Sequence, residues 1–258
     1  MDRQYYLDCI DEGKKLYVKM LGAARGLMLH LDEEIEYMVS EPHGCAEYIF
    51  NFNIPDGRVQ EVIEKLMADI KEKKMPGYIL ISPLARPQNI VEILESKGFR
   101  INRSSGYGMA MDLDKSVIDL KIPEGVEVSP VRDEDTLAVW AEIVNKALFG
   151  FFSLERIRDM YELKNTEFFM GYIEGKPVST SMAIMSDTGE TAAVEWVSTL
   201  EEYRNRGAGR AVTLASIKYM YERGVKTAVL HATPSGEKIY EKVGFKEYYT
   251  CTEAIYGE

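Results

Sequence analysis

Two glycines between arginines form the stretch of this sequence that is best suited to chemistry, RNRGAGR at residues 204–210. Gly207 and Gly209 come just before residues 207–223, which are predicted to form a helix. Backbone N–H groups at a helix start have no partner within the helix, and the helix dipole favours an anion there. Glycine lets a large group approach the backbone, and guanidinium groups add charge-assisted hydrogen bonds. The stretch fits a phosphate-binding loop. The plainer interpretation is an ordinary surface helix that begins with solvated arginines.

Two common phosphate-binding motifs do not match this stretch. A P-loop ends in Gly-Lys-Ser/Thr, whereas residues 209–211 are Gly-Arg-Ala and offer no hydroxyl to hold magnesium. A dinucleotide-binding fingerprint has its third glycine where Val212 stands. It also has an acid at the end of the next strand, where residues 231–233 are His-Ala-Thr. The sequence therefore argues against both a P-loop and a dinucleotide-binding motif.

Residues that can move protons lie on both sides of the loop. Residues 191–200 (TAAVEWVSTL) are predicted to form a long strand, and Glu195 lies on it, nine residues before Arg204. Residues 230–245 (LHATPSGEKIYEKVGF) carry Tyr240. A carboxylate can accept a proton from an amine, and a phenol can donate one. The plainer interpretations are a surface glutamate on an edge strand and a tyrosine that packs its ring on the sheet.

Together these features resemble the GNAT superfamily of N-acetyltransferases. The pattern Arg204-x-x-Gly207-x-Gly209 between a strand and a helix resembles the superfamily's pyrophosphate loop, and residues 230–245 resemble its closing segment. Many members carry a carboxylate at the position of Glu195. The resemblance covers residues 126–258 and implies acetyl-CoA as cosubstrate, a primary amine as acceptor, and direct attack through a tetrahedral intermediate. It implies no metal.

The resemblance also implies roles for individual residues. Tyr240 would be the general acid that protonates the thiolate leaving group, and Glu195 the general base, with water or another group as the alternative base. An alternating strand would place Glu195 on one face with Val197 and Thr199, and Trp196 on the other. The pantetheine arm would pair with the strand backbone, as a peptide adds to a sheet edge. The expected acetyl-CoA-binding residues are Val197, Ser198, Thr199, Arg204, Arg206, Gly207, Ala208, Gly209, Arg210, Thr233 and Tyr240.

Two further polar positions have alternative interpretations. His231 lies in an apolar strand, where it is either a second candidate base or a hydrogen-bonded structural residue. Thr233 and Ser235 precede a short helix, so they either bind the pantetheine or cap that helix.

The predicted elements that position these residues have a mixed order, which indicates an α+β fold in which each central mixed sheet is flanked by helices. In the first half we expect helices over 3–22, 59–70 and 87–99, and strands over 34–39, 46–53 and 77–82. In the second half we expect strands over 126–131, 191–200, 226–233 and 245–256, a hairpin over 167–186, and helices over 133–147, 154–162, 207–223 and 236–242.

A short internal repeat predicts two copies of one domain type. ILESKGFR at 93–100 aligns without gaps with IYEKVGFK at 239–246. We therefore predict a degenerate GNAT-like domain over 1–118, a linker over 119–125, and a catalytic domain over 126–258. In the first copy Leu94 stands where the second has Tyr240, and Arg-x-x-Gly-x-Gly is absent. That copy would complete the acceptor cleft, extend the sheet or mediate a contact. The alternative is a coincidental repeat in an unrelated α/β domain.

Composition limits the partners. The 258 residues are 46% hydrophobic and carry a formal net charge of -11, which disfavours nucleic acid and tolerates a cationic amine. The three cysteines fit neither a metal site nor a disulfide framework, which favours the cytoplasm. No apolar run is long enough to span a membrane. We expect a small-molecule or peptide amine as partner, and a homodimer through sheet edges. The competing function is a non-catalytic acyl-CoA-binding or sensing protein.

Overall fold

The computed structural model describes residues 2–148, 150 and 152–257, and the chain divides into two compact units. Unit 1 comprises Met1–Arg25 and Gly108–Tyr248, and unit 2 comprises Gly26–Tyr107 and Tyr249–Glu258. This division differs from the predicted ranges 1–118, 119–125 and 126–258. The N-terminal helix packs within unit 1, and the last strand ends within unit 2.

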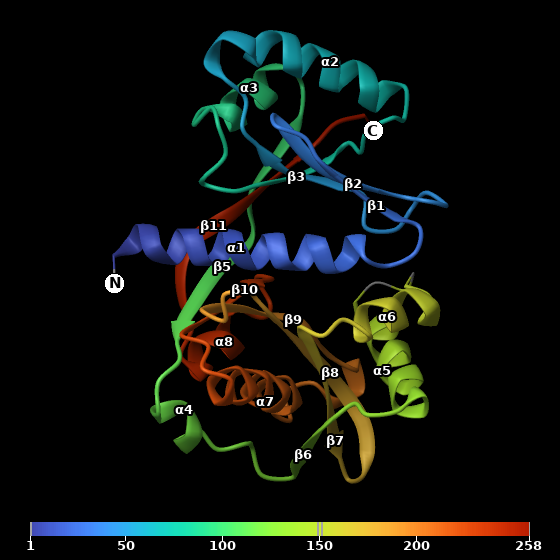
Figure 1. Ribbon diagram of the computed structural model, residues 1–258, viewed down its shortest axis with the longest axis vertical. Helices are drawn as coiled ribbons and strands as arrows, with labels where there is room; N and C mark the ends of the chain where they lie inside the picture. Colours follow the sequence, from blue (N-terminus) through green and yellow to red (C-terminus); the bar gives the residue numbers. More distant parts are fainter. Residues whose placement is uncertain (1, 149, 151, 258) are drawn as a thin grey trace. The chain divides into compact units, whose positions relative to one another are not determined.

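Unit 1 is a mixed sheet with helices on both faces (Figure 1). Helix α7 packs on β7, β8 and β9, while α1 and α5 pack on β8 and β9. Phe169 contacts Tyr219 of α7, and its neighbour Phe168 contacts Trp140 of α5, so the two helices cover opposite faces. The strand order is β5-β10-β9-β8-β7-β6. The elements are α1 (Arg3–Gly22), α4 (Ser116–Asp119), β6 (Val126–Pro130), α5 (Glu134–Ala147), α6 (Leu154–Tyr161), β7 (Thr166–Ile173), β8 (Lys176–Met185), β9 (Thr191–Thr199), α7 (Ala208–Glu222), β10 (Thr227–Ala232) and α8 (Glu237–Val243), with a 3-10 turn at Glu201–Tyr203.

Unit 2 is a smaller mixed sheet with an aliphatic core. Its strand order is β1-β2-β3-β4-β11-β5, and β3 runs parallel to β4 with Ile49 opposite Ile79. Helix α2 buries Val62, Ile63 and Leu66 in this core. The elements are β1 (Leu27–Leu31), β2 (Ile35–Ser40), β3 (Tyr48–Phe52), a 3-10 turn (Asp56–Arg58), α2 (Val59–Lys71), β4 (Tyr78–Ile81) and α3 (Ile90–Ser96). Strands β5 (Arg100–Asp112) and β11 (Lys246–Ile255) contribute residues to both units.

The same order of elements occurs twice along the chain. The series β3-α2-β4-α3-β5 and β9-α7-β10-α8-β11 each contain a parallel strand pair joined by a helix, then a helix and a further strand. Gly98 and Gly244 follow α3 and α8 at φ values of 92° and 125°, a region that favours glycine. The repeated octapeptide therefore lies at equivalent places in the two series.

Most predicted elements are confirmed, and two strands were missed. The sequence patterns did not predict β1 or the 13-residue β5. The first seven residues of β5, RINRSSG, are mostly polar and mostly exposed, so they lack the alternation that marks a strand. Among the described residues, no helix combines the length and apolarity that crossing a membrane requires.

Candidate active site

Strands β9 and β10 pair at one end and separate at the other. They are parallel partners at Thr191↔Thr227, Ala192↔Ala228 and Ala193↔Val229, and the pairing ends there. Residues 194–199 of β9 and residues 230–232 of β10, which we call the fork, are not paired with each other. Unpaired strand backbone needs other hydrogen-bond partners. The fork can therefore receive an extended, amide-containing ligand.

A bulge lies in the β9 arm of the fork. Ser198 is opposite Thr180 and Glu195 is opposite Met182, so two residues of β9, Trp196 and Val197, face a single residue of β8. Trp196 has a φ of 49°, which is an outlier for a bulky side chain. Strained backbone of this kind persists where its surroundings hold it.

Contacts on the indole hold the bulge in place. The Trp196 Nε1–H donates to the Tyr17 hydroxyl over 3.0 Å. The ring stacks on Trp140, with 5.8 Å between centroids, and also packs on Phe152. The bulge thus depends on helix α1 as well as on α5.

The bulge changes the face on which Val197 and Thr199 lie relative to Glu195. Ala193 faces α1, since a Cβ on Gly13 would be 3.6 Å from the Ala193 Cβ, and two residues along the strand Glu195 lies on the same face. A Cβ on Gly209 of α7 would instead be 3.4 Å from Thr199 Oγ1 and 3.9 Å from Val197 Cγ1. The expectation that Glu195 shares a face with Val197 and Thr199 is therefore wrong, because the bulge shifts the alternation.

Glu195 has the electrostatics of a general base. Burial raises the pKa of its carboxyl to about 8. Among the described residues, none donates a hydrogen bond to this carboxyl. At neutral pH the group is largely protonated, and its conjugate base is strong enough to take a proton from an ammonium ion or a bridging water.

Tyr240 lies within electrostatic range of Glu195 and has the properties of a proton donor. Burial, and then the charge of Glu195, raise the pKa of its phenol above the ordinary value. The residue is only 9% exposed, and its ring packs on Phe245. The hydroxyl is therefore protonated throughout the physiological range and can donate to a leaving thiolate.

The start of α7 carries unmet hydrogen-bond donors. Gly207 is its N-cap, no side chain caps the helix, and the first turn holds no acidic residue. Within the described chain, no acceptor is found for the N–H groups of Gly207, Ala208 and Gly209. Asp2 and Asp133 cap α1 and α5. The helix start is therefore suited to an anion.

Glycine occurs at the two loop positions, 207 and 209, for different structural reasons. Gly207 has a φ of 88°, and a Cβ there would be 2.8 Å from the Pro123 Cβ, so the fold itself requires glycine. Gly209 is in ordinary helical conformation, and a Cβ there would meet nothing closer than 3.4 Å. The fold does not require Gly209, and its bare backbone leaves room for a phosphate group.

The three arginines surround the loop and each donates one hydrogen bond within the protein. Arg206 pairs with Glu174 at 2.7 Å, Arg210 donates to the Lys121 carbonyl at 3.4 Å, and Arg204 Nε donates to the Thr199 carbonyl at 3.4 Å. A guanidinium group has five N–H donors, so these bonds are compatible with phosphate contacts.

The remaining predicted residues have mainly structural contacts. The hydroxyls of Ser198 and Thr199 bond those of Thr180 and Ser179 at 2.6 and 3.0 Å, so their side chains are used within the sheet. Thr233 Oγ1 accepts from the Gly236 N–H at 3.2 Å and lies 3.1 Å from Ser235 Oγ. These two residues stabilise the turn before α8, without a side-chain cap on the helix itself. Ala208 is buried against Val126 and Val178.

His231 lies on the β10 arm and is neutral at pH 7. Although solvent reaches His231, the surrounding protein and then the charge of Lys14 lower its pKa to about 4. A base this weak does not suit deprotonation of an ammonium ion.

Sequence reasoning missed the groups that α1 brings to this site. Tyr17 contacts Trp196, and Lys14 and Asp11 act on His231. Gly13, an isolated glycine within a helical pattern, was the available signal, because such a glycine indicates close packing.

Among the described residues, no group of three or more His, Cys, Asp and Glu side chains could hold a metal ion.

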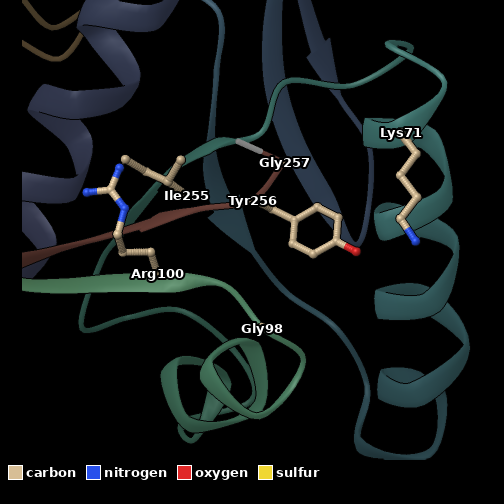
Figure 2. A pocket seen from close by; sticks show the side chains of 6 residues that line it. All are labelled: Lys71, Gly98, Arg100, Ile255, Tyr256 and Gly257. Carbon is tan, nitrogen blue, oxygen red and sulfur yellow. The ribbon is translucent and has the colours of Figure 1, made fainter.

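A recess of about 400 Å³ lies in unit 2, apart from the fork, and is shown in Figure 2. Its lining residues are Lys71, Gly98, Arg100, Ile255, Tyr256 and Gly257, and Lys71 Nζ lies 5.9 Å from the centre of the Tyr256 ring.

Comparison with known proteins finds a family match over part of the chain. Residues 137–245, which are less than half of the chain, match the model of the acetyltransferase (GNAT) family. We call this matched segment the GNAT domain. The matched segment contains the β9 arm, the glycine loop, α7, β10 and Tyr240, so the site lies within the GNAT domain.

Solved structures share the fold across nearly the whole chain. A GCN5-related N-acetyltransferase from Kribbella flavida is similar at TM-score 0.68 and 16% identity, covering 95% of this chain and 96% of that one. One from Sphaerobacter thermophilus gives TM-score 0.64 and 17% identity, with coverages of 88% and 81%. A tandem GNAT protein from the clavulanic acid biosynthesis pathway gives TM-score 0.60 and 10% identity, covering 96% of each chain. The predicted mixed fold, with sheets flanked by helices, is confirmed.

A curated relative is similar over a shorter segment. The uncharacterized protein YyaT of Bacillus subtilis (strain 168) is 31% identical over 75 residues, which are 29% of this chain. The match spans about half (49%) of that relative's length.

Proposed function

We propose that the GNAT domain transfers an acetyl group from acetyl-CoA to a primary amine by direct attack of the amine. The observation that carries this proposal is the fork, whose β9 arm is not paired with β10, bears Glu195 and leads to the uncapped start of α7. When bound, acetyl-CoA supplies an activated acetyl thioester.

The residues present fit this cosubstrate. The N–H groups at the start of α7 would hold the pyrophosphate, with Arg206 and Arg210 adding charge. Gly209 keeps the backbone accessible there. The backbone of residues 194–199 would pair with the pantetheine amides, and an N–H on the β9 arm would stabilise negative charge on the thioester oxygen.

Two side chains would move the protons. The acceptor amine must lose a proton, and Glu195 would accept it directly or through water, because burial has raised its pKa to about 8. Tyr240 would donate a proton to the departing sulfur, since its phenol keeps its proton at every physiological pH.

The first series of elements would be a tandem copy that lacks this site. Helix α2 follows a turn that contains Asp56 and carries Glu61 in its first turn, which disfavours an anion. Leu94 is fully buried where the second series has Tyr240. We therefore propose one acetyl-CoA site per chain.

Calorimetric titration of the purified chain with acetyl-CoA tests the site count. We expect a stoichiometry of one. A stoichiometry of two would contradict our account of the first series, and no binding by folded protein would contradict the cosubstrate site.

Thiol release with a panel of amines tests transfer. We expect release that depends on the amine and falls at least tenfold in Tyr240→Phe. Binding of acetyl-CoA without turnover of any amine would indicate an acyl-CoA-binding or sensing protein. Unchanged turnover in both Glu195→Gln and Tyr240→Phe would contradict the proton-transfer roles.

A further inference from the structure

Strand β1 forms one edge of the sheet of unit 2. Among the described strands it pairs with β2 alone, in antiparallel register from Leu27↔Ser40 to Leu31↔Glu36. In such a pair, every second residue of a strand directs its backbone N–H and C=O groups toward the neighbouring strand, and the others direct them away from it. An edge strand therefore presents a row of backbone groups to which a further strand can pair.

One backbone hydrogen bond identifies the residues of β1 that face outward. The Glu41 N–H donates to the Gly26 carbonyl over 2.7 Å, and these two residues continue the β1–β2 register by one position. Opposite residues that bond each other alternate with opposite residues that do not. Leu27, Leu29 and Leu31 therefore direct their N–H and C=O groups away from β2. Within the described chain, no acceptor is found for these three N–H groups.

The edge formed by β1 lacks the features that prevent pairing. Its sequence, LMLHL, contains no Asp, Glu, Lys, Arg or Pro. Met28 and Leu31 are 42% and 55% exposed, and they are two of the six exposed large hydrophobic residues of the described chain. The other edge strand, β6, contains Glu127 and ends at Pro130. Charged residues and proline protect edge strands from pairing, so β6 is protected and β1 is not.

Strand β1 is complementary to a second copy of itself. A two-fold axis beside Leu29 would set this residue opposite Leu29 of the second copy, and would set Leu27 opposite the second copy's Leu31. These are the residues whose backbone groups face outward, so each such pair would exchange two hydrogen bonds. The register centred on Leu29 is therefore the one that uses every outward N–H and C=O group of β1.

The chain carries opposite charges on the two sides of β1. Arg25 precedes the strand with a largely exposed side chain, and the exposed residues Asp32 and Glu33 follow it. An antiparallel pair brings the start of one strand to the end of the other, so Arg25 would lie near the second copy's acidic residues. Arg25 also bonds Asp159, and a guanidinium has enough donors for both contacts. This charge complementarity favours a second copy of the chain as the partner.

We propose that the chain forms a two-fold dimer in which β1 pairs with β1 of a second copy, antiparallel and centred on Leu29. This assigns the homodimer expected from the sequence to one strand and one register. The pair would cover Met28 and Leu31 and would join the two unit 2 sheets into one continuous sheet. Because the contact is small, we expect a dissociation constant in the micromolar range. The inference does not depend on the proposed transfer reaction.

Proline substitutions test the edge, because proline has no N–H to give to a partner strand. Leu31→Pro removes an outward N–H and leaves the hydrogen bonds to β2 in place. Val128→Pro is the matched control on β6. The Val131 N–H bonds the Phe168 carbonyl, so the same alternation makes Val128 an outward residue.

Sedimentation of the full-length protein from about 1 to about 200 µM measures the dissociation constant of each variant. We expect wild type and Val128→Pro to dimerise alike, and Leu31→Pro to raise the dissociation constant at least tenfold. Circular dichroism checks that each variant is folded.

Cysteine substitutions test the register without proline. In the proposed pair the Cα atoms of the two Leu29 residues would be about 5.5 Å apart, which permits a disulfide. Those of the two Leu31 residues would be roughly 14 Å apart, because four residues of strand separate them. We therefore expect mild oxidation to give a disulfide-linked dimer in Leu29→Cys and not in Leu31→Cys. Wild type, whose three cysteines are free, serves as the blank.

The outcomes separate the proposed interface from other associations. A dimer that Leu31→Pro weakens and Leu29→Cys traps would support the inference. Wild type that stays monomeric at every concentration would overturn it, as would a dimer that Leu31→Pro leaves unchanged. A cross-link in Leu31→Cys and not in Leu29→Cys would contradict the register. If Leu31→Pro does not fold, the two cysteine variants decide.

Discussion

The indole N–H of Trp196 donates to the hydroxyl of Tyr17 over 3.0 Å, which connects the N-terminal helix to the bulge beside Glu195. Trp196 has a φ of 49°, so this hydrogen bond helps to hold a strained residue in the GNAT domain. The carboxylate that we propose as the base therefore depends for its position on a segment more than a hundred residues before the family match.

Replacing Tyr17 with Phe should disturb the base more than the fold. The change removes one hydrogen bond, so we expect a loss of about 1 kcal/mol in the free energy of unfolding. We also expect a lower kcat with little change in acetyl-CoA affinity, because Tyr17 acts on Glu195 through Trp196. Chemical denaturation and pH-rate profiles check this, and an unchanged profile together with an unchanged kcat would contradict it.

The rate of transfer should rise with pH through about 8. The Glu195 carboxyl has a pKa raised to about 8 by burial, so the basic form appears above that pH. In wild type, kcat/KM should therefore increase with pH up to about pH 8. In Glu195→Gln this increase should be absent, and the rate should be at least tenfold lower. If the Glu195→Gln variant kept the increase of kcat/KM with pH, the titrating group would be a residue other than Glu195.

The same carboxyl should make stability fall as pH rises. A carboxyl whose pKa is about 4.3 when unfolded and higher when folded holds its proton more tightly in the folded state. Its contribution is full below pH ~4 and is lost as the pH approaches ~8. Glu195→Gln does not titrate, so its denaturation midpoint minus that of wild type should increase as the pH rises from ~4 to ~8. A difference in midpoint that stays constant over this pH range would argue against the raised pKa.

Gly207→Ala should mainly lower the stability of the fold, whereas Gly209→Ala should mainly lower the affinity for acetyl-CoA. At Gly207 the positive φ and the Pro123 contact predict a loss of about 1–2 kcal/mol in unfolding free energy. At Gly209 the fold has room for a methyl group, so stability should hold while acetyl-CoA affinity falls about tenfold or more. Thermal unfolding and calorimetry measure the two effects, and full affinity in Gly209→Ala would contradict the phosphate site.

The end of α1 should loosen at low pH. Arg25 donates to Asp159 of α6 from its backbone N–H and from its guanidinium at 2.6 and 2.8 Å, which lowers the pKa of the carboxyl to about 2. This stabilisation is present above about pH 4 and is lost as the pH falls toward 2. Asp159→Asn should reduce hydrogen-exchange protection over the last turns of α1 at pH 7, and equal protection in variant and wild type would contradict it.

The chemistry-bearing loop could be found from the sequence because its signals are local. A strand, Arg204-x-x-Gly207-x-Gly209 and a helical run are neighbours along the chain, and the structure places them together as β9 and the start of α7. Tyr240 followed from a second local pattern, the helix before a Gly-Phe pair. The repeated octapeptide likewise marks equivalent turns after α3 and α8.

Tertiary structure decided what depends on distant segments. Tyr17 and Trp140, far away in the sequence, contact the indole of Trp196 at the bulge, and strand alternation alone wrongly placed Glu195 on the same face as Val197 and Thr199. The packing of α1 at Gly13 depends on Val229, and no periodicity within the helix identifies that partner. Local sequence thus specifies which residues can do chemistry, whereas non-local packing specifies which face of the sheet they occupy and what surrounds them.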